Sequence, residues 1–442
     1  YFIIFTDIIF SKWNKKKFTP PKSSITSFVL RIFFHILLFS LFIIHLGYGQ
    51  CRGDINLDHT VDDEDISFVV NHILDIDLIE GDGFDNGDID GNAVINIFDL
   101  IAVVDISIYT DSEWCDFPPI DLSLAWQVEE DLSYFDSDSL QNIINNEIAA
   151  LQYIRGFIVI HRGKILSEDY FNGSSIGQNY NIWSVTKSYI STLIGQAIDQ
   201  GLISNQYVTL DSIFYQNSFT TLVTLEHLLT MTSGWPENGY YMYLENILDI
   251  LLNTNLVWSP GSVWYYSNAA CHINSYVLQW TTGMNPKAFA MENLFPQLGL
   301  GNPYWGVDAD GVNNGSYDLY LTLRKMVKLG QLYLQDGYSA DDQILSSEWV
   351  AAATSGQTNY WYEYLWWLPG IGYLAVGLGG QYIAVVPELD LVIGVHSATE
   401  SSSFYQEQLL DIIYDQVVPL FDLNRSLNNY GINFEHITNA IK

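Results

Sequence analysis

The sequence is poor in cysteine and in basic residues. Only three of its 442 residues are cysteine, too few for a small protein held together by a disulfide framework. Lysine and arginine number 17 against 51 acidic residues, which gives a formal net charge of −34 at pH 7. A chain of this charge is repelled by nucleic-acid phosphates and by anionic lipid, so we expect no nucleic-acid partner.

Histidine spacings typical of metal sites are also missing. None of the nine histidines belongs to an HExxH or similar ligand pattern, so a zinc hydrolase is not supported. Hydrophobic residues, in contrast, make up 48% of the chain and aromatic residues 15%. A chain of this length and composition is long enough for two or three domains and is not disordered by composition.

A basic segment followed by an apolar run marks the N-terminal region. Residues 12–31 are basic, and the apolar run from Ile32 to Leu46 spans 15 residues, fewer than the roughly 18 expected of a membrane-spanning helix. This order predicts a signal peptide within residues 1–49, cleaved after Gly49, with the first residues lying upstream of it. We therefore expect a secreted protein, extracellular or periplasmic, with no stable membrane span after cleavage. Lipidation of Cys51 is a weaker alternative.

Residues 51–115 are strongly acidic, with 17 acids against the single base Arg52. Oxygen-bearing residues recur there at positions 1, 3, 5, 7, 9 and 12 of two loops that begin 34 residues apart. This is the ligand spacing of an EF-hand calcium loop, in which every second side chain turns toward one cation. The predicted ligands are Asp54, Asn56, Asp58, Thr60, Asp62 and Asp65 in the first loop, and Asp88, Asp90, Asn92, the Val94 carbonyl, Asn96 and Asp99 in the second.

Each loop leads into an apolar stretch, residues 66–76 and 100–108, that predicts a short helix, so we expect a small all-α module over residues 50–116. The pair of loops, with aspartate at position 12, resembles a type I dockerin domain. The resemblance implies structural Ca²⁺ and docking onto a cohesin-type partner protein. His59 and Ala93 stand where such loops usually have a glycine. A disulfide between Cys51 and Cys115 would bracket the module and leave Cys271 free.

Residues 117–442 form the second expected domain. Strand candidates lie at both of its ends, at 157–161 and 164–171 and again at 371–377, 381–387 and 391–396. The middle is mainly helical. An antiparallel sheet made from both chain ends, with helices inserted between them, is an α+β arrangement.

A serine and a lysine stand three residues apart at the start of a predicted helix. Ser184 and Lys187 belong to the segment SVTK, which opens the apolar-periodic stretch from Tyr189 to Ile198. Residues at this spacing lie one helical turn apart on the same face, so the amine can reach the hydroxyl. Serine becomes a strong nucleophile only when a base removes its proton, and an uncharged lysine can be that base. A single S-x-x-K match is common, however, and by itself indicates only a helix start.

Two further segments accompany this pair. Tyr266-Ser267-Asn268 offers a phenol that can pass protons and an amide that can orient a carbonyl substrate. The segment GLGGQ at 377–381 enters a strand with almost no side chain, which lets a ligand approach the backbone closely. In this order, and with LLTMTSGW at 228–235 and KMVKLGQLYL at 325–334, the segments resemble the class C-like branch of the serine β-lactamase, penicillin-binding protein and esterase superfamily.

The resemblance implies the β-lactamase/transpeptidase-like fold, with a helical subdomain beside the sheet, and an acyl-enzyme mechanism. Ser184 would be the acylated nucleophile, Lys187 its activating partner and Tyr266 the proton shuttle. Asn268 would orient the substrate. The oxyanion hole would combine the amide of Ser184 with an amide of the glycine segment, Gly379 or Gly380, with Gly380 favoured.

Gly377 departs from the superfamily pattern, because β-lactamases have a lysine at this position and many relatives a histidine. No cation is therefore expected for a β-lactam carboxylate, and the GxGGQ form is similar to 6-aminohexanoate-dimer hydrolases and related carboxylesterases. The expected activity is hydrolysis of small ester or amide bonds without a catalytic metal. Candidate residues for the acyl pocket are Trp183, Tyr240, Tyr241 and Trp361.

Three alternatives remain open. The same site could serve a penicillin-binding-type D-peptidase or a β-lactamase, or the fold could be a non-catalytic binding module. A rival nucleophile is Ser175, since residues 173–177 fit the pattern G-x-S-x-G. That motif needs a strand before it and a helix after it, whereas the flanking residues here predict a turn and a loop.

Overall fold

A computed structural model describes residues 119–133, 135–215, 222–356 and 361–421, together with residues 63–74 and some single positions between Ile55 and Val103 and at Ile437. The chain divides into two compact units, Tyr1–Asp116 and Phe117–Lys442. Among the described residues, no helix is both long and apolar enough to cross a membrane.

The first unit is described chiefly by helix α3, Asp63–Ile73, where the sequence predicts a helix after the first acidic loop. Val69 and Val103 are buried in one apolar cluster with Ile55 and Ile95. The two valines are 34 residues apart, the same spacing as the two loops, so equivalent positions of the repeat share one small core. The expected signal peptide and the expected disulfide partners Cys51 and Cys115 lie outside the described residues, as do all the expected calcium ligands except Asp65.

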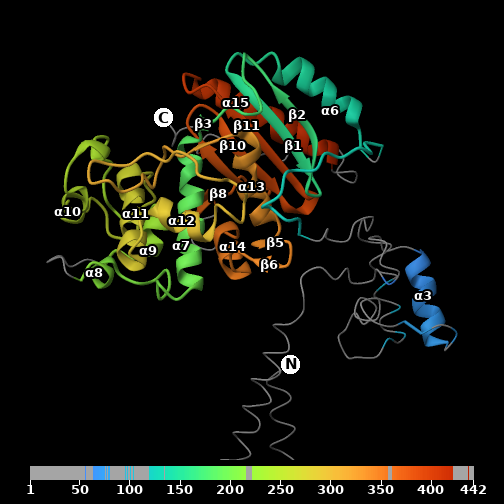
Figure 1. The fold of residues 1–442 in the computed structure, drawn as a ribbon, viewed down its shortest axis with the longest axis horizontal. Helices are drawn as coiled ribbons and strands as arrows, with labels where there is room; N and C mark the ends of the chain where they lie inside the picture. The colour runs from blue at the N-terminus through green and yellow to red at the C-terminus, as the bar shows by residue number, and fades with distance from the viewer. Residues whose placement is uncertain are drawn as a thin grey trace, which may run out of the picture. The chain divides into compact units, whose positions relative to one another are not determined.

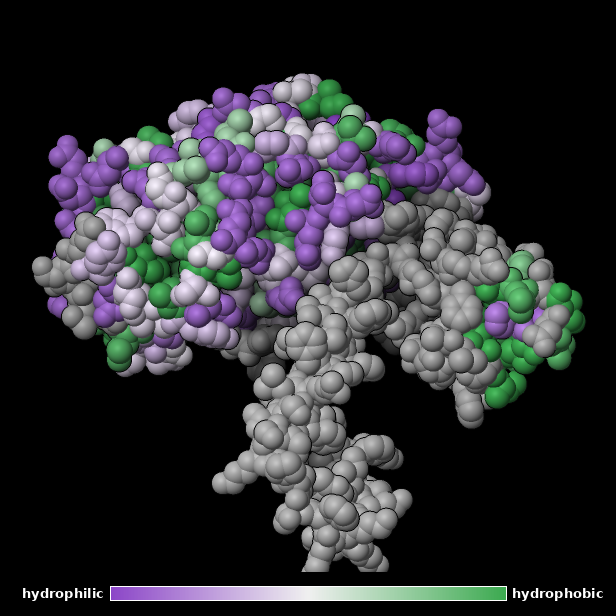
Figure 2. Space-filling model, turned by 60° about the horizontal axis from the view of Figure 1, so that its bottom comes forward, coloured by the Kyte–Doolittle hydropathy of each residue, from purple (hydrophilic) through white to green (hydrophobic). Residues whose placement is uncertain are grey.

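Asp65, the last expected ligand of the first loop, is fully buried. Its Oδ1 accepts the backbone N–H of Ile55 at 2.6 Å, so it ties the start of the loop to the start of α3. After the helix, Leu74, Ile76 and Leu78 are exposed, and Figure 2 shows the described side chains of this unit as largely hydrophobic.

The second unit contains, within its described residues, a seven-stranded antiparallel sheet in the order β2-β1-β11-β10-β9-β8-β7 (Figure 1). The strands are β1 Ile154–His161, β2 Lys164–Tyr170, β7 Tyr362–Glu363, β8 Trp366–Trp367, β9 Tyr373–Gly377, β10 Gln381–Val386 and β11 Leu391–Ser397. β1 pairs with β11, for example Phe157 with Val395, so the two ends of the domain meet in the middle of the sheet. The expected antiparallel sheet and α+β class are confirmed.

Helices pack on both faces of this sheet, and a further group of helices lies beside it (Figure 1). The helices are α6 Ser137–Ile143, α7 Thr186–Asp199, α8 Leu210–Ile213, α9 Leu225–Leu229, α10 Ile247–Leu252, α11 Asn268–Thr282, α12 Pro286–Asn293, α13 Leu323–Leu334, α14 Ser347–Thr354 and α15 Ser403–Asp411. Tyr382 of β10 donates its hydroxyl to Gln406 of α15 at 3.3 Å, while the next residue, Ile383, faces Gly330 of α13. Because successive side chains of a strand point to opposite faces, α15 and α13 lie on opposite sides of the sheet.

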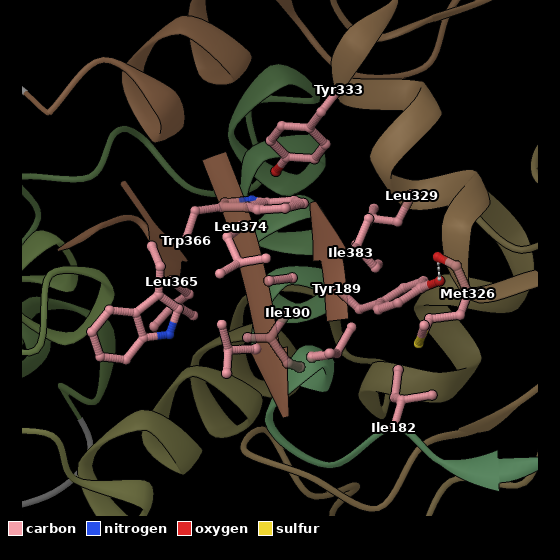
Figure 3. Close-up of a cluster of buried hydrophobic side chains, with 14 of the residues drawn as sticks. Ile182, Tyr189, Ile190, Met326, Leu329, Tyr333, Leu365, Trp366, Leu374 and Ile383 are labelled. Atoms are coloured by element: carbon pink, nitrogen blue, oxygen red, sulfur yellow. Dashed lines mark hydrogen bonds between the residues drawn. The ribbon is translucent and has the colours of Figure 1, made fainter. Parts of the chain in front are cut away.

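Helix α7 is held by a buried cluster between α13 and the sheet (Figure 3). Tyr189 of α7 donates its hydroxyl to the Met326 carbonyl of α13 at 3.2 Å. The labelled cluster consists of Ile182, Tyr189, Ile190, Met326, Leu329, Tyr333, Leu365, Trp366, Leu374 and Ile383. Close packing of this kind resists displacement, so the start of α7 has a defined place at the sheet edge.

Candidate active site

Ser184 lies in a single 3₁₀ turn, Trp183–Val185, directly before α7. The turn begins with an unusual backbone, because Trp183 has a φ of 49° and donates its N–H to Asn181 Oδ1 at 2.8 Å. Strand β9 lies against this turn at Gly377, where an added Cβ would meet the Ile182 carbonyl at 2.4 Å. Only a residue without a side chain fits at this point. The close approach of Gly377 brings the glycine segment beside Ser184.

Lys187 points its amine at three oxygen atoms and is only 1% exposed. Its Nζ lies 2.9 Å from Ser184 Oγ, 2.8 Å from Asn268 Oδ1 and 2.9 Å from the Ser316 carbonyl. An ammonium group has three donors, and all three find an acceptor here. A free amine has two N–H groups and one lone pair. Because Asn268 Oδ1 and the Ser316 carbonyl can only accept, they take both N–H groups and leave the lone pair for the serine hydroxyl.

Tyr266 lies beside the same amine, with its ring centroid 4.8 Å from Lys187 Nζ. Aromatic side chains fix the ring: Trp367 stacks on it at 6.1 Å, and Trp264 and Tyr362 contact its edges. The tyrosine therefore has a fixed position within the cluster that the serine, the lysine and the asparagine form.

Asn268 is the first residue of α11, which Ser267 caps by accepting the N–H of Ala270 at 3.1 Å. Since its Oδ1 already accepts from Lys187, its amide nitrogen is the group that can donate to a substrate. Glu237 accepts the N–H of Ala269 at 3.4 Å, and its carboxylate forms no salt bridge with any described residue. A carboxylate without an ion-pair partner among the described residues thus lies next to Asn268.

The glycine segment forms the tight turn between β9 and β10. Gly379 and Gly380 have φ values of 85° and 93°, which favour glycine. The N–H of Gly380 donates to the Gly377 carbonyl at 3.2 Å, so this amide is engaged inside the turn. The N–H of Leu378, in contrast, donates no hydrogen bond to any residue that the structure describes.

The other sequence candidates take varied positions. Trp183 adjoins Ser184. The ring of Trp361 packs at a tilt against that of Trp264, with centroids 4.6 Å apart, and Trp264 in turn contacts the Tyr266 ring. Tyr240 is 75% exposed, whereas Tyr241 is buried. Ser175 follows a turn, and the next element is the two-residue strand β3, Tyr180–Asn181. No helix follows this serine, so the elbow geometry that its motif requires is missing.

Several residues of the site were not predicted from the sequence. Ser316 supplies the carbonyl that binds Lys187, and Asp318 accepts from Asn181 Nδ2 at 3.1 Å with a φ of 78°. Burial raises the pKa of the Asp318 carboxyl. Burial likewise raises the pKa of the Cys271 thiol, which is free and buried, so it is not poised as a nucleophile. Backbone carbonyls have no sequence signature, and no pattern could have indicated Ser316.

Comparisons with known proteins support the fold. A model of the family "Beta-lactamase" matches residues 148–416, more than half of the chain. An uncharacterized protein of Alkalihalophilus pseudofirmus is 24% identical, with 53% of this chain and 80% of that protein covered. A putative 6-aminohexanoate-dimer hydrolase from Bacillus anthracis superposes with a TM-score of 0.55 at 21% identity, over 70% of this chain and 92% of that one. A putative beta-lactamase from Bacteroides dorei superposes with a TM-score of 0.57 at 17% identity, over 65% of this chain and 99% of that one.

Proposed function

Because the chain belongs to the beta-lactamase family, we propose that it is a serine hydrolase that cleaves small ester or amide bonds through an acyl-enzyme on Ser184. The observation that carries this proposal is the environment of Lys187 Nζ, which touches the serine hydroxyl and two acceptor-only oxygens. Such contacts orient a free amine as a base toward the serine.

The first half of the reaction forms the acyl-enzyme. Ser184 Oγ attacks the substrate carbonyl carbon while its proton passes to the Lys187 amine, and the carbonyl electron pair moves onto oxygen. Backbone amides stabilise this oxyanion. Because the Gly380 amide is engaged in its turn, we assign the second donor to Leu378, next to the amide of Ser184.

The second half releases both products. The bond to the leaving alcohol or amine breaks, and the departing group takes a proton through Tyr266 and Lys187. Water then attacks the ester on Ser184 and gives a proton to the same base. As the bond between the acyl carbon and Ser184 Oγ breaks, the base returns the proton to Oγ, and the carboxylic acid leaves. Every proton transfer in these steps uses Ser184, Lys187 or Tyr266, which lie together in one cluster.

The decisive experiment is the hydrolysis of a short-chain chromogenic ester. We expect Ser184→Ala to abolish turnover, and Ser175→Ala, the matched control at the rival motif, to leave it unchanged. A D-Ala-D-Ala peptide, a linear amide and a chromogenic cephalosporin measured in parallel separate the esterase and amidase from the D-peptidase and the β-lactamase. Absence of turnover and of Ser184 labelling by a fluorophosphonate would favour the non-catalytic binding module.

For residues 50–116 we propose a structural calcium module of the dockerin type that docks onto a cohesin-type partner. Carboxylate and amide oxygens are the donors that Ca²⁺ prefers, and the burial of Val69 and Val103 in one cluster supports a paired repeat. We expect a chelator to loosen this module, measured as proteolysis within residues 51–115, and to leave ester hydrolysis largely intact. Parallel loss of hydrolysis would contradict two independent modules.

We also propose that the protein is secreted after cleavage of residues 1–49. The support is the basic segment followed by an apolar run too short for a stable membrane span. N-terminal sequencing of the exported protein is the test, with Gln50 as the expected first residue. Retention of the apolar run in the mature protein would refute this.

A further inference from the structure

Behind the site lies a buried polar cluster of His272, Tyr276 and Asp308, which takes no part in the mechanism above. Asn268, His272 and Tyr276 are spaced four residues apart on α11, so they lie along one face of the helix. Asn268 accepts from Lys187, and the two residues below it both contact Asp308. One helix face therefore connects the base to the loop that runs from Asp308 to Ser316, the 308–316 loop.

Asp308 is fully satisfied inside the protein. Its Oδ2 lies 2.9 Å from His272 Nε2 and accepts the Tyr276 hydroxyl at 2.6 Å. Its Oδ1 accepts the backbone N–H groups of Asp310 and Val312 at 3.0 and 2.8 Å. Burial acts to raise the pKa of Asp308, but the hydrogen bonds from His272 and Tyr276 outweigh it and hold this pKa below its ordinary value. The carboxylate thus stays charged, and by accepting the N–H groups of Asp310 and Val312 it holds the start of the loop in a tight turn.

His272 links this carboxylate to the loop end that touches the base. Its Nδ1 accepts the N–H of Gly315 at 3.0 Å, so Nδ1 carries no proton and the Nε2–H donates to Asp308. The next residue, Ser316, accepts from Lys187 through its carbonyl and donates its hydroxyl to the Asn268 carbonyl at 2.7 Å. His272 therefore holds the residue directly before the carbonyl that orients the lysine.

The loop touches the helix so closely that no side chain fits between them. A Cβ on Gly315 would meet Ser275 Oγ at 2.6 Å and His272 Cα at 3.3 Å. The Cys271 thiol contacts the Gly315 carbonyl at 3.7 Å from the same helix. Small displacements of the loop are thereby restricted, and the Ser316 carbonyl has one position.

We propose that His272, held by Asp308 and Tyr276, is a positioning residue for the base Lys187. The inference rests on the proposed acyl-enzyme function. By accepting the N–H of Gly315, His272 fixes the position of the Ser316 carbonyl. This carbonyl accepts one N–H of the Lys187 amine and so directs the lone pair of the amine to Ser184. A shift of the carbonyl by about 1 Å would let the amine turn away, and misplacement of this size costs about 10²-fold in rate.

Two variants of His272 separate positioning from simple stabilisation. In His272→Asn the amide oxygen can replace Nδ1 and keep the Gly315 contact, while the contact with Asp308 is lost. In His272→Gln the amide nitrogen can reach Asp308, while the acceptor for Gly315 is lost. Both variants lose the imidazole ring and its packing, and the melting temperature of each shows how much stability it loses.

We expect His272→Asn to retain kcat within about 10-fold and His272→Gln to lose about 10²-fold, with KM for a neutral ester nearly unchanged in both. The rate of Ser184 labelling by a fluorophosphonate should likewise fall only slightly in His272→Asn and much further in His272→Gln. Equal losses that follow the melting temperature, or a full kcat in His272→Gln, would overturn the proposal.

If the histidine variants do not fold, Tyr276→Phe tests the same proposal. It removes one hydrogen bond from Asp308 and leaves the ring, and we expect a several-fold lower kcat with unchanged KM; an unchanged kcat would again overturn the inference. Failure of the proposed function looks different, because the wild-type protein would then neither hydrolyse the ester nor label at Ser184.

Discussion

Replacing Asn268 with aspartate tests whether Lys187 acts as an uncharged base. The substitution keeps the acceptor 2.8 Å from Lys187 Nζ and adds a negative charge. At this distance and an effective dielectric constant of about 20, the charges attract by about 6 kcal/mol. Desolvation of the new carboxylate cancels roughly half of this. A remaining preference of about 3 kcal/mol for the ammonium lowers the fraction of free amine about 10²-fold wherever most of the lysine carries its proton.

The assay is kcat/KM for an uncharged chromogenic ester between pH 6 and pH 10. We expect Asn268→Asp to be about 10²-fold slower than the wild type at neutral pH and to recover as the pH rises, because alkali frees the amine. Asn268→Leu is the matched control, since it removes the same contacts without adding charge, and it should be slow at every pH. A near-normal rate in Asn268→Asp, or a loss without recovery at high pH, would refute the role of Lys187 as base.

Three further predictions concern substrate charge preference, the pH dependence of stability and the packing around a buried glycine. Glu237→Gln should reduce the preference for cationic over anionic esters about 3-fold, measured as the ratio of kcat/KM values, because an unpaired carboxylate is lost near Asn268; an unchanged ratio would exclude Glu237 from substrate recognition. Burial lowers the pKa of His396 to about 3 from 6.5, so the unfolded chain binds a proton below pH 6.5 that the folded chain does not. This shift alone should lower stability by about 1 kcal/mol per pH unit between pH 6.5 and pH 4, measured by urea unfolding. Burial lowers the pKa of His161 to about 3 as well, so His396→Leu should reduce the acid slope by about 1 kcal/mol per pH unit rather than abolish it. Gly394→Ala should cost about 1–3 kcal/mol, because its Cβ would meet Val327 Cγ1 at 2.1 Å; Gly177→Ala, with open space around it, is the thermal-melting control.

The sheet could be predicted well from local patterns. Short apolar runs at both ends of the second domain were predicted as strands, and β1, β2, β9, β10 and β11 lie there within a few residues. Strands buried on both faces, such as β10, give continuous apolar runs that are easily recognised. The two-residue strands β7 and β8 were not predicted, because a segment of two residues has no periodicity to detect.

The site could be predicted in part. The spacing of Ser184 and Lys187 indicated their contact, since one helical turn separates them. The pairing with Asn268, 81 residues away in the chain, depended on a family resemblance. His272 could not be singled out from the sequence, because its partners Asp308 and Gly315 are distant in the chain.

The sequence by itself determined the chemistry of the groups: a serine and a lysine one turn apart, a phenol, an amide, and a glycine where relatives carry a cation. Local spacing suffices for these, because neighbouring residues on a helix or in a turn have little freedom. Only the tertiary structure decided which oxygens surround the amine of Lys187. The Ser316 carbonyl belongs to the backbone, which every residue shares, and the packing of α11 against the 308–316 loop alone brings it to the base.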